Sequence, residues 1–298
     1  MTQPSTDADG RWTVGRLLTW TADFLKKRGA ENPRVARLEA EVLLASALGW
    51  RRVELYTHFE DDVPEPPRST FRDLVRRRGE GTPVAYLVGR KEFYSLDFKV
   101  TTDVLIPRPD SEFVVAEFLD LTKSIMNVRA VDVGTGSGCL ALACASKHPT
   151  AELFAVDLSP EAIAVAVQNA RALGLESRVT FRQGDRLAPV AEDGPFDAIL
   201  SNPPYIKTAD LATLESGVRR HEPRLALDGG DDGLRVVAPL IAESAALLKS
   251  GGHLILEIGS DQEAEVRALI EAEPAFELAA TIRDHADHPR VIRARRRD

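Results

Sequence analysis

The four consecutive residues Asn202-Pro203-Pro204-Tyr205 form a turn that can offer hydrogen-bond acceptors without competing donors. We call this segment the acceptor turn, or the Asn202 turn. Proline has no backbone N–H, and each proline restrains the residue before it to an extended conformation. The side-chain oxygen of Asn202 and the carbonyl of Pro203 can therefore both face outward, and Tyr205 adds a flat aromatic surface beside them. Two acceptors next to a stacking surface fit a substrate that carries a planar amino group.

A planar amide nitrogen is a poor nucleophile because its lone pair is delocalised into the carbonyl. Acceptors that hold both of its N–H groups fix the plane of the amide and aim the nitrogen at an electrophile. The same hydrogen bonds strengthen as positive charge builds on nitrogen in the transition state. On this interpretation Asn202, Pro203 and Tyr205 are catalytic, and Pro204 joins them in binding the substrate. The sequence indicates no general base.

A second group, Gly134-Thr135-Gly136-Ser137-Gly138, stands between an apolar run and a segment rich in Ala and Leu. A strand, a glycine turn and the start of a helix form a ligand cradle at the carboxyl end of a parallel sheet. The dinucleotide fingerprint G-x-G-x-x-G would need glycine where this chain has Cys139, and no Lys-Ser/Thr pair marks a phosphate loop. The pattern favours a nucleoside without phosphates.

Acidic residues end the next two predicted strands. Asp157 lies about 20 positions beyond Gly134, the place from which an acid can bind the hydroxyls of a ribose. Asp185 can accept a hydrogen bond from an adenine amino group, and Arg186 could stack on the base through its guanidinium plane. Each acid alone could simply cap a helix, but their succession after a glycine turn favours an adenosine-type ligand.

The spacing of apolar residues predicts the elements that hold these groups. Strands are expected at 130–133, 153–156, 179–181, 198–200 and 253–258, and helices at 139–146, 161–173 and 234–248. Strands that alternate with helices indicate an α/β fold with a mostly parallel sheet covered on both faces. Phe276–Ile282 and Val291–Ala294 are expected to close this sheet as an antiparallel pair.

The N-terminal part is expected to be different. Helical periodicity over residues 1–81 predicts a small all-helical domain, followed by a hairpin or linker at 82–104 and the α/β domain at 105–298. Its helices are expected to end at Gly29, Gly49 and Gly79. The basic run Arg76-Arg77-Arg78 is interpreted as a solvated helix end.

The charge of the chain argues against a protein that binds nucleic acid. The chain has 38 Lys and Arg against 46 Asp and Glu, a net charge of −8. Residues 1–90 hold 15 basic and 13 acidic residues, so the rest holds 23 and 33 and is acidic. A nucleic-acid enzyme should have a basic cleft, so direct nucleic-acid binding is not expected.

Location and oligomeric state are expected from weaker signals. Cys139 and Cys144 fall on one predicted helix at a spacing that does not let them bridge, which suits a reducing compartment. Residues 1–10 have no signal-peptide pattern, and no apolar run reaches the length of a membrane span. We expect a cytoplasmic monomer. His285 and His288 lie in a polar turn and are expected to be exposed rather than metal ligands.

Further motifs in the sequence resemble those of one protein family. The glycine turn, Asp157 and the Asn202 turn are similar to S-adenosylmethionine-dependent methyltransferases of planar amino groups. Over nearly its whole length the chain resembles the HemK/PrmC-type release factor glutamine methyltransferases. The motifs that carry this resemblance are Thr82-Pro83-Val84-Ala85-Tyr86-Leu87, Glu92-Phe93-Tyr94, Leu105-Ile106-Pro107-Arg108-Pro109-Asp110-Ser111-Glu112, Glu222-Pro223-Arg224-Leu225-Ala226-Leu227 and Asp231-Asp232-Gly233-Leu234.

The resemblance implies a Rossmann-like class I methyltransferase sheet with a helical N-terminal domain that grips the substrate. It implies transfer of methyl from S-adenosylmethionine, leaving S-adenosylhomocysteine, to the amide nitrogen of the glutamine in the Gly-Gly-Gln motif of class 1 peptide chain release factors. Gly134 to Gly138 and Asp157 would bind the cofactor, Pro203 to Tyr205 the glutamine, and Asn202 both. Many relatives have an aromatic residue after the acid at position 185, where this chain has Arg186.

Three alternatives stay open at this point. The same acceptor turn occurs in enzymes that methylate amino groups of DNA or RNA. A paralogue methylates glutamine in a ribosomal protein, but it tends to carry Arg-Ser-Pro where this chain has Arg108-Pro109-Asp110. A non-catalytic module that only binds adenosylmethionine or a ribosomal partner would have no need of the acceptor turn.

Overall fold

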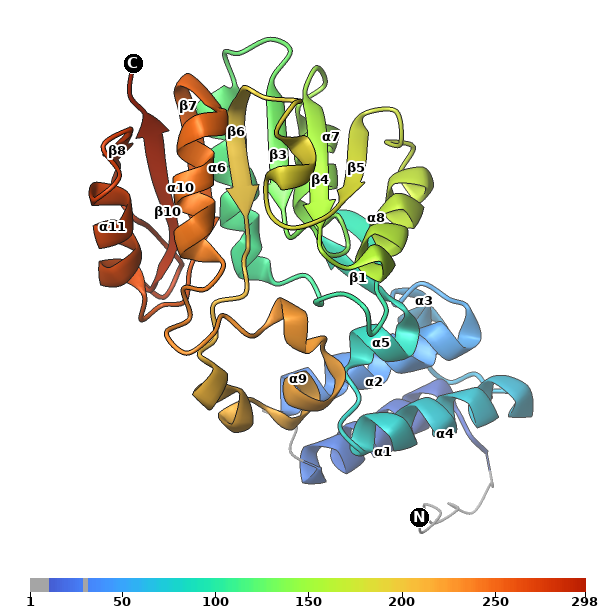
Figure 1. The fold of residues 1–298 in the computed structure, drawn as a ribbon. Helices are drawn as coiled ribbons and strands as arrows, with labels where there is room; N and C mark the ends of the chain where they lie inside the picture. The colour runs from blue at the N-terminus through green and yellow to red at the C-terminus, as the bar shows by residue number, and fades with distance from the viewer. Residues whose placement is uncertain (1–10, 29–31) are drawn as a thin grey trace. The chain divides into compact units, whose positions relative to one another are not determined.

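The computed structural model describes residues 11–28 and 32–298 and divides the chain into two compact units, Met1–Gly89 and Arg90–Asp298. Figure 1 follows the chain from blue at the N-terminus to red at the C-terminus. The expected end of the first helix at Gly29 and the N-terminal residues 1–10 lie outside the described residues.

The first unit is helical. Its helices are α1 (Val14–Lys27), α2 (Pro33–Leu48), α3 (Glu54–Thr57), α4 (Glu65–Gly79) and α5 (Val84–Val88). The side chain of Asn32 accepts hydrogen bonds from the backbone N–H groups of Arg34 and Val35 and so caps the start of α2, and Gly49 ends this helix with φ 69°. The predicted ends at Gly49 and Gly79 are confirmed, whereas α3 and α5 were not predicted.

The second unit begins with a hairpin, β1 (Arg90–Phe93) and β2 (Leu96–Lys99). Tyr94 and Ser95 connect the strands with φ values of 50° and 62°, as the tight turn of a two-residue hairpin requires. Phe93 and Phe98 are buried in the core of the α/β unit, so the hairpin packs with this unit. Residues 84–88, expected in the hairpin or linker, instead form helix α5 of the first unit.

The second unit is built on an eight-stranded sheet in the order β5-β4-β3-β6-β7-β10-β8, with β9 paired to β10. The strands are β3 (Arg129–Val133), β4 (Glu152–Asp157), β5 (Val179–Gln183), β6 (Phe196–Ser201), β7 (Leu248–Glu257), β8 (Phe276–Leu278), β9 (Ile282–Arg283) and β10 (Pro289–Arg296). The pairs among β3 to β7 are parallel, and β10 is antiparallel to each of its neighbours. The predicted α/β fold with a closing antiparallel pair is confirmed.

Helices cover both faces of the sheet (Figure 1). They are α6 (Glu112–Thr122), α7 (Cys139–Lys147), α8 (Pro160–Ala172), α10 (Val237–Leu247) and α11 (Glu263–Glu271). The unit also has the short helix α9 (Ser216–His221) and the 3₁₀ turns η1 (Pro109–Ser111), η2 (Ala188–Val190), η3 (Thr208–Thr213) and η4 (Arg224–Ala226). Apolar residues of α6, α7 and α8 form one buried cluster against the sheet, and those of α10 and α11 form the cluster on its other face. Alternate strand residues such as Ala130 and Val131 enter opposite clusters, as a sheet buried on both faces requires.

The strand order reverses between β3 and β6. The chain crosses from β3 outward to β4 and β5, then returns to β6 on the other side of β3. Ligands of open α/β sheets bind beyond the carboxyl ends of the strands at such a switch point. The glycine turn follows β3 and the Asn202 turn follows β6, so both predicted sites lie there. Within the described part of the chain, none of the helices has the length and apolar character needed to cross a membrane.

Candidate active site

A cavity of about 320 Å³ opens at the carboxyl ends of β3, β4, β5 and β6. It brings together most of the residues predicted for the two ligands: Gly134, Gly136, Asp157, Asp185, Arg186, Asn202, Pro203 and Pro204. Two segments complete its wall, residues 102–105 after the hairpin and Pro223, Leu225 and Ala226 near η4. Residues far apart in sequence thus form one site.

The glycine turn faces the cavity with two of its three glycines. Gly134 and Gly136 have φ values of 74° and 55°, and a Cβ placed on either would stand in open space. Gly138 serves packing instead, because a Cβ there would lie 3.0 Å from Leu142 Cδ1 and 3.2 Å from Ala166 Cβ. Thr135 and Ser137 are buried behind the turn. Of the five predicted positions, Gly134 and Gly136 are the two in the cavity wall.

Asp132 holds the turn from below and was not singled out from the sequence. Its Oδ2 accepts hydrogen bonds from Thr135 Oγ1 at 2.7 Å and from the backbone N–H of Ala141 at 3.2 Å. Its Oδ1 has no hydrogen-bond partner among the described residues. Burial raises the pKa of Asp132 to about 7, against the lowering effect of those hydrogen bonds. A carboxyl inside an apolar strand, two residues before a glycine turn, was the signal available in the sequence.

Asp157 ends β4 at the cavity wall. Its Oδ2 accepts from the backbone N–H of Gly136 at 2.8 Å, and its Oδ1 accepts from that of Ser159 at 2.9 Å. Burial raises the pKa of Asp157, and hydrogen bonds from these backbone groups oppose the rise. Each carboxylate oxygen has a second lone pair, so the group can still accept from a ligand.

Arg186 is held between two carboxylates. Its Nη1 lies 2.7 Å from Asp185 Oδ2, and its Nε donates to Glu243 Oε1 at 2.8 Å. These contacts fix the guanidinium plane at the cavity wall, where a stacking group is expected. The hydrogen bond with Glu243 also raises the pKa of Arg186. Glu243 lies on α10 and could not have been connected with Arg186 from the sequence.

The carboxamide of Asn202 is oriented by a serine. Its Nδ2 donates to Ser111 Oγ at 2.9 Å, which leaves Oδ1 as the acceptor that the turn was expected to offer. Pro203 is buried and Pro204 half-buried, and both line the cavity. The structure places Tyr205 beside the cavity rather than in its wall: its Cδ2 lies 3.3 Å from the position that a Cβ on Gly259 would take. Burial raises the pKa of Tyr205, so its phenol stays neutral.

A loop backs the Asn202 turn through close backbone contacts. Gln262 Nε2 donates to the carbonyls of Tyr205 and Gly233, both at 3.2 Å. A Cβ on Gly229 would lie 2.8 Å from the Pro204 carbonyl oxygen, so only glycine fits there. Asp228 anchors the loop by accepting from Thr208 Oγ1 at 2.6 Å. This bond, with those from the Gly230 backbone N–H and from Arg224, lowers the pKa of Asp228 to about 2.

Glu222 ties the other wall of the cavity together. Its Oε2 accepts from the backbone N–H of Ile106 at 3.3 Å, and its Oε1 accepts from Arg108 Nη2. Arg108 Nη1 in turn donates to the carbonyl of Ile106 at 3.1 Å. These bonds join the segment before η1 to the segment before η4, so two motifs that lie far apart in the sequence form one wall of the site.

Comparison with known proteins decides the family. A family profile described as "PrmC N-terminal domain" matches residues 16–89, and one described as "Methyltransferase small domain" matches residues 111–230. A release factor glutamine methyltransferase of Rhodopirellula baltica is 43% identical over 291 residues, which cover 96% of this chain and 97% of the relative. A release factor glutamine methyltransferase of Moorella thermoacetica is 46% identical over 286 residues, which cover 96% of this chain and 99% of the relative. The chain belongs to the release factor glutamine methyltransferase family.

Solved structures agree on the fold. A methyltransferase from Pyrococcus furiosus matches with a TM-score of 0.50 and 18% identity, over 76% of this chain and 98% of that one. The relatives and the methyltransferase domain model show that the chain is an enzyme, and its fold is the class I methyltransferase fold that the sequence indicated. Methyltransferases of this type use S-adenosylmethionine.

The cavity of this methyltransferase fits that cofactor. The open space above Gly134 and Gly136 is the cradle that a side chain would fill. Asp157 provides a hydrogen-bond acceptor on one wall, while Val156 and Ala162 provide apolar surface. An adenosine with an uncharged thioether or sulfonium arm needs such a combination of acceptors and apolar contacts.

The two histidines and two cysteines considered in the sequence do not line the cavity. His285 and His288 are exposed, as expected, and His288 lies beside Asp284. Cys139 and Cys144 are free thiols on α7, and burial raises the pKa of Cys139 to about 12. Arg76 pairs with Asp73 and Glu80 at the end of α4, which agrees with a solvated helix end.

Proposed function

We propose that the enzyme transfers the methyl group of S-adenosylmethionine to the side-chain amide nitrogen of the glutamine in the Gly-Gly-Gln motif of class 1 peptide chain release factors. The observation that carries the proposal is the orientation of Asn202. Its Nδ2 is engaged by Ser111, so its oxygen is the free acceptor in the same cavity as the glycine turn. The names of the relatives agree with this substrate.

The chain's residues have defined roles in binding the cofactor. Bound S-adenosylmethionine would supply an electrophilic methyl group whose leaving group departs neutral. Gly134 and Gly136 provide the cradle, and Asp157 accepts from the ribose hydroxyls. Thr135, Ser137 and Gly138 shape the turn from behind. Asp185 and Arg186 bind the adenine at the opposite wall, the acid by accepting from its amino group and the guanidinium by stacking.

The acceptor turn holds the glutamine. Asn202 Oδ1 and the Pro203 carbonyl accept from the two N–H groups of the substrate amide, which fixes its plane and aims its nitrogen. Pro204 supplies cavity wall and Tyr205 an adjacent aromatic side chain. Both acceptors bind more strongly as positive charge develops on the nitrogen, so they stabilise the transition state more than the ground state. The proton that leaves the nitrogen afterwards needs no dedicated base.

The other parts of the proposal concern the partner and its recognition. We assign residues 1–81 to recognition of the release factor, 82–104 to the linking segment and 105–298 to methyl transfer. The match of residues 16–89 to the PrmC N-terminal domain supports this assignment. The acidic character of the chain beyond residue 90 supports a protein substrate without direct nucleic-acid binding. Two free thiols support a cytoplasmic location, and a monomer is the simplest state.

Transfer of labelled methyl tests the proposal directly. Purified release factor with an intact Gly-Gly-Gln motif is compared with its Gln→Ala variant, with labelled S-adenosylmethionine as donor. We expect label in the intact protein alone, at one site per molecule. Equal labelling of both proteins would exclude this glutamine as the acceptor. A glutamine-containing ribosomal protein and an adenine-containing oligonucleotide, tested in parallel, distinguish the alternative substrate classes.

A further inference from the structure

Ser111 is a buried contact of the acceptor turn that the proposed roles do not yet use. It ends η1, is 2% exposed, and its Oγ accepts the hydrogen bond from Asn202 Nδ2. A serine hydroxyl has one proton to donate and two lone pairs. What Ser111 does with that proton decides which end of the Asn202 carboxamide it can bind.

A buried carboxyl lies on the far side of Ser111. Glu257 ends β7, and the preceding residue Leu256 pairs with Ser201, so Glu257 and Asn202 follow paired residues of neighbouring strands. Glu257 is 1% exposed, and its Oε2 has no hydrogen-bond partner within residues 11–28 and 32–298. Burial raises the pKa of Glu257 to about 7, and a hydrogen bond with Ser111 opposes the rise. Burying an ionisable group with an unpaired oxygen costs folding free energy, and groups of this kind cluster at functional sites.

We propose that Ser111 and Glu257 are positioning residues that fix which way the Asn202 carboxamide faces; this inference rests on the proposed function. When Glu257 is ionised, the Ser111 hydroxyl donates to it and can only accept from Asn202. Asn202 must then turn its N–H toward Ser111 and its oxygen toward the substrate. If the Asn202 carboxamide were flipped, its N–H groups would face the N–H groups of the substrate glutamine, and no hydrogen bond could form between them.

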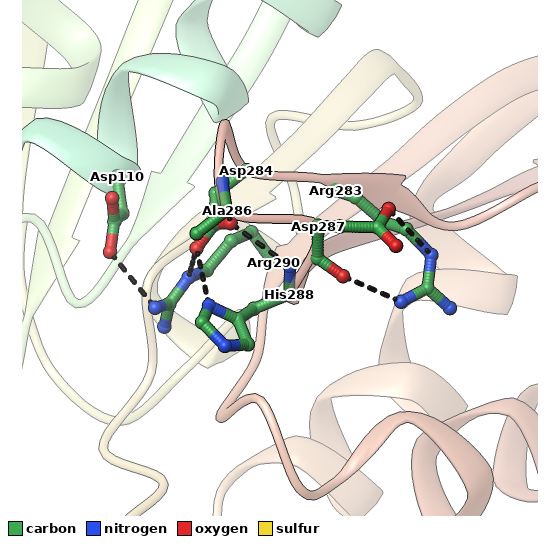
Figure 2. Close-up of polar contacts among 7 residues, drawn as sticks. All are labelled: Asp110, Arg283, Asp284, Ala286, Asp287, His288 and Arg290. Carbon is green, nitrogen blue, oxygen red and sulfur yellow. Dashed lines mark hydrogen bonds and ion pairs between the residues drawn. The ribbon is translucent and has the colours of Figure 1, made fainter.

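A second layer holds Ser111 in place (Figure 2). Arg290 Nη2 lies 3.3 Å from Asp110 Oδ2, next to Ser111, and its Nε donates to Asp284 Oδ2 at 2.8 Å. Asp284 also accepts hydrogen bonds from the backbone N–H groups of His288 and Ala286. These two bonds and the one from Arg290 hold the pKa of Asp284 well below its usual range. The turn between β9 and β10 thus anchors the residue that precedes the serine.

The positioning role makes methyl transfer depend on the charge of Glu257. Once protonated, Glu257 can itself donate to Ser111, and the serine is free to donate to Asn202 Oδ1 and stabilise the flipped carboxamide. The groups that face Glu257 are Arg108 and Asp110 around η1, Arg290 on β10, Tyr205 in the acceptor turn and Cys139 on α7. Asp132, under the glycine turn, is the other carboxyl whose pKa burial raises to about 7, so Asp132→Asn is measured beside Glu257→Gln to separate their effects on kcat.

Two substitutions test the proposal, Glu257→Gln and Ser111→Ala, with Ser111→Thr as the hydroxyl-conserving variant. Glu277→Gln is the matched control, because Glu277 is an exposed acid on another strand of the same sheet. For each, kcat and KM for release factor methylation are measured from pH 6 to 9. The affinity for S-adenosylmethionine and the unfolding free energy are measured on the same samples.

We expect kcat of Glu257→Gln and of Ser111→Ala to fall about 10- to 100-fold at pH 8, the size of effect that misplacing a positioned group has. The affinity for the cofactor should change less than about 3-fold, since its binding groups are untouched. Ser111→Thr and Glu277→Gln should keep kcat within about 3-fold of the wild type. The fall in wild-type kcat below pH 7 should be absent from Glu257→Gln. This variant should be at least as stable as the wild type at pH 8, because it removes a buried charge.

Wild-type labelling of the intact Gly-Gly-Gln motif is measured first. Its absence overturns the proposed function and, with it, this inference. Its presence together with unchanged kcat in Glu257→Gln and Ser111→Ala overturns the positioning role alone. Two other results also overturn it. One is a fall in kcat below pH 7 that is as large in Glu257→Gln as in the wild type. The other is a parallel loss of stability and activity in both variants. Either result would show that these residues contribute to packing alone.

Discussion

The backbone N–H of Gly136 donates to Asp157 Oδ2 over 2.8 Å, so the glycine turn after β3 and the acid that ends β4 hold each other in place. The second oxygen of Asp157 receives the N–H of Ser159 at the start of α8. One carboxylate therefore sets both the shape of the cradle and the wall against which we place the ribose. The two sequence signals for a nucleoside are parts of one hydrogen-bonded structure.

We expect Asp157→Ala to weaken binding of S-adenosylmethionine by about 1.5–3 kcal/mol, or roughly 10- to 150-fold, because charge-assisted hydrogen bonds of this size are lost and the Gly136 amide is left unpaired. Isothermal titration calorimetry measures the change. Asp185→Ala is the comparison, since the Asp185 side chain is 55% exposed and forms an ion pair with Arg186. A larger loss from Asp185→Ala than from Asp157→Ala would contradict the assignment.

Asn202→Ala should separate catalysis from cofactor binding. The variant loses the acceptor oxygen that we assign to the substrate amide, and kcat should fall at least about 100-fold, as for removal of a group that acts in the transition state. Cofactor affinity should drop only modestly, because Gly134, Gly136 and Asp157 stay in place. Single-turnover methylation and calorimetry measure the two quantities on one preparation. Near-normal rates would remove Asn202 from its role.

The sequence predicted the parts of the site that lie in continuous segments. Strand, turn and helix follow one another from Ala130 to Ser146, so apolar spacing and glycine chemistry were enough to locate the cradle. The Asn202 turn was equally local, because two prolines determine its backbone. Helices α6 and α11 were not predicted, although both cover the sheet.

The supporting contacts could not be predicted, because they depend on which strands become neighbours. Ser111 and Asn202 are 91 residues apart and meet only once η1 reaches the carboxyl end of β6. Glu257 joins them because β7 pairs with β6, a fact of strand order rather than of local sequence. Arg186 and Glu243 are likewise separated by 57 residues. Local chemistry identified the groups that face the ligands, and tertiary packing selected the groups behind them.

Gly229→Ala should damage the acceptor turn without touching a substrate contact. The new Cβ would lie 2.8 Å from the carbonyl oxygens of Pro204 and Gly233, and backbone atoms cannot yield as a flexible side chain can. We expect a loss of about 1–3 kcal/mol in stability, the usual cost of overpacking, and a fall in kcat because the turn is displaced. Gly174→Ala is the control: it has φ 68° and no atom within 4 Å of the added Cβ. It should cost stability and leave kcat unchanged, and equal kcat in both variants would contradict the prediction.

Asp132→Asn should change how stability depends on pH. The folded-state pKa of Asp132 is raised to about 7 from 3.8, so between these values the folded protein holds a proton that the unfolded chain has released. Stability from this group is therefore greatest at low pH and declines as pH rises toward 7, the reverse of a salt-bridged carboxylate. Asparagine cannot ionise, and the variant should be more stable than the wild type by about 1–3 kcal/mol at pH 8.5. At pH 5 the difference should be near zero or slightly unfavourable. Urea unfolding of both proteins at the two pH values measures it, and a stability difference that does not change with pH would show that Asp132 is ionised in the folded protein at pH 5.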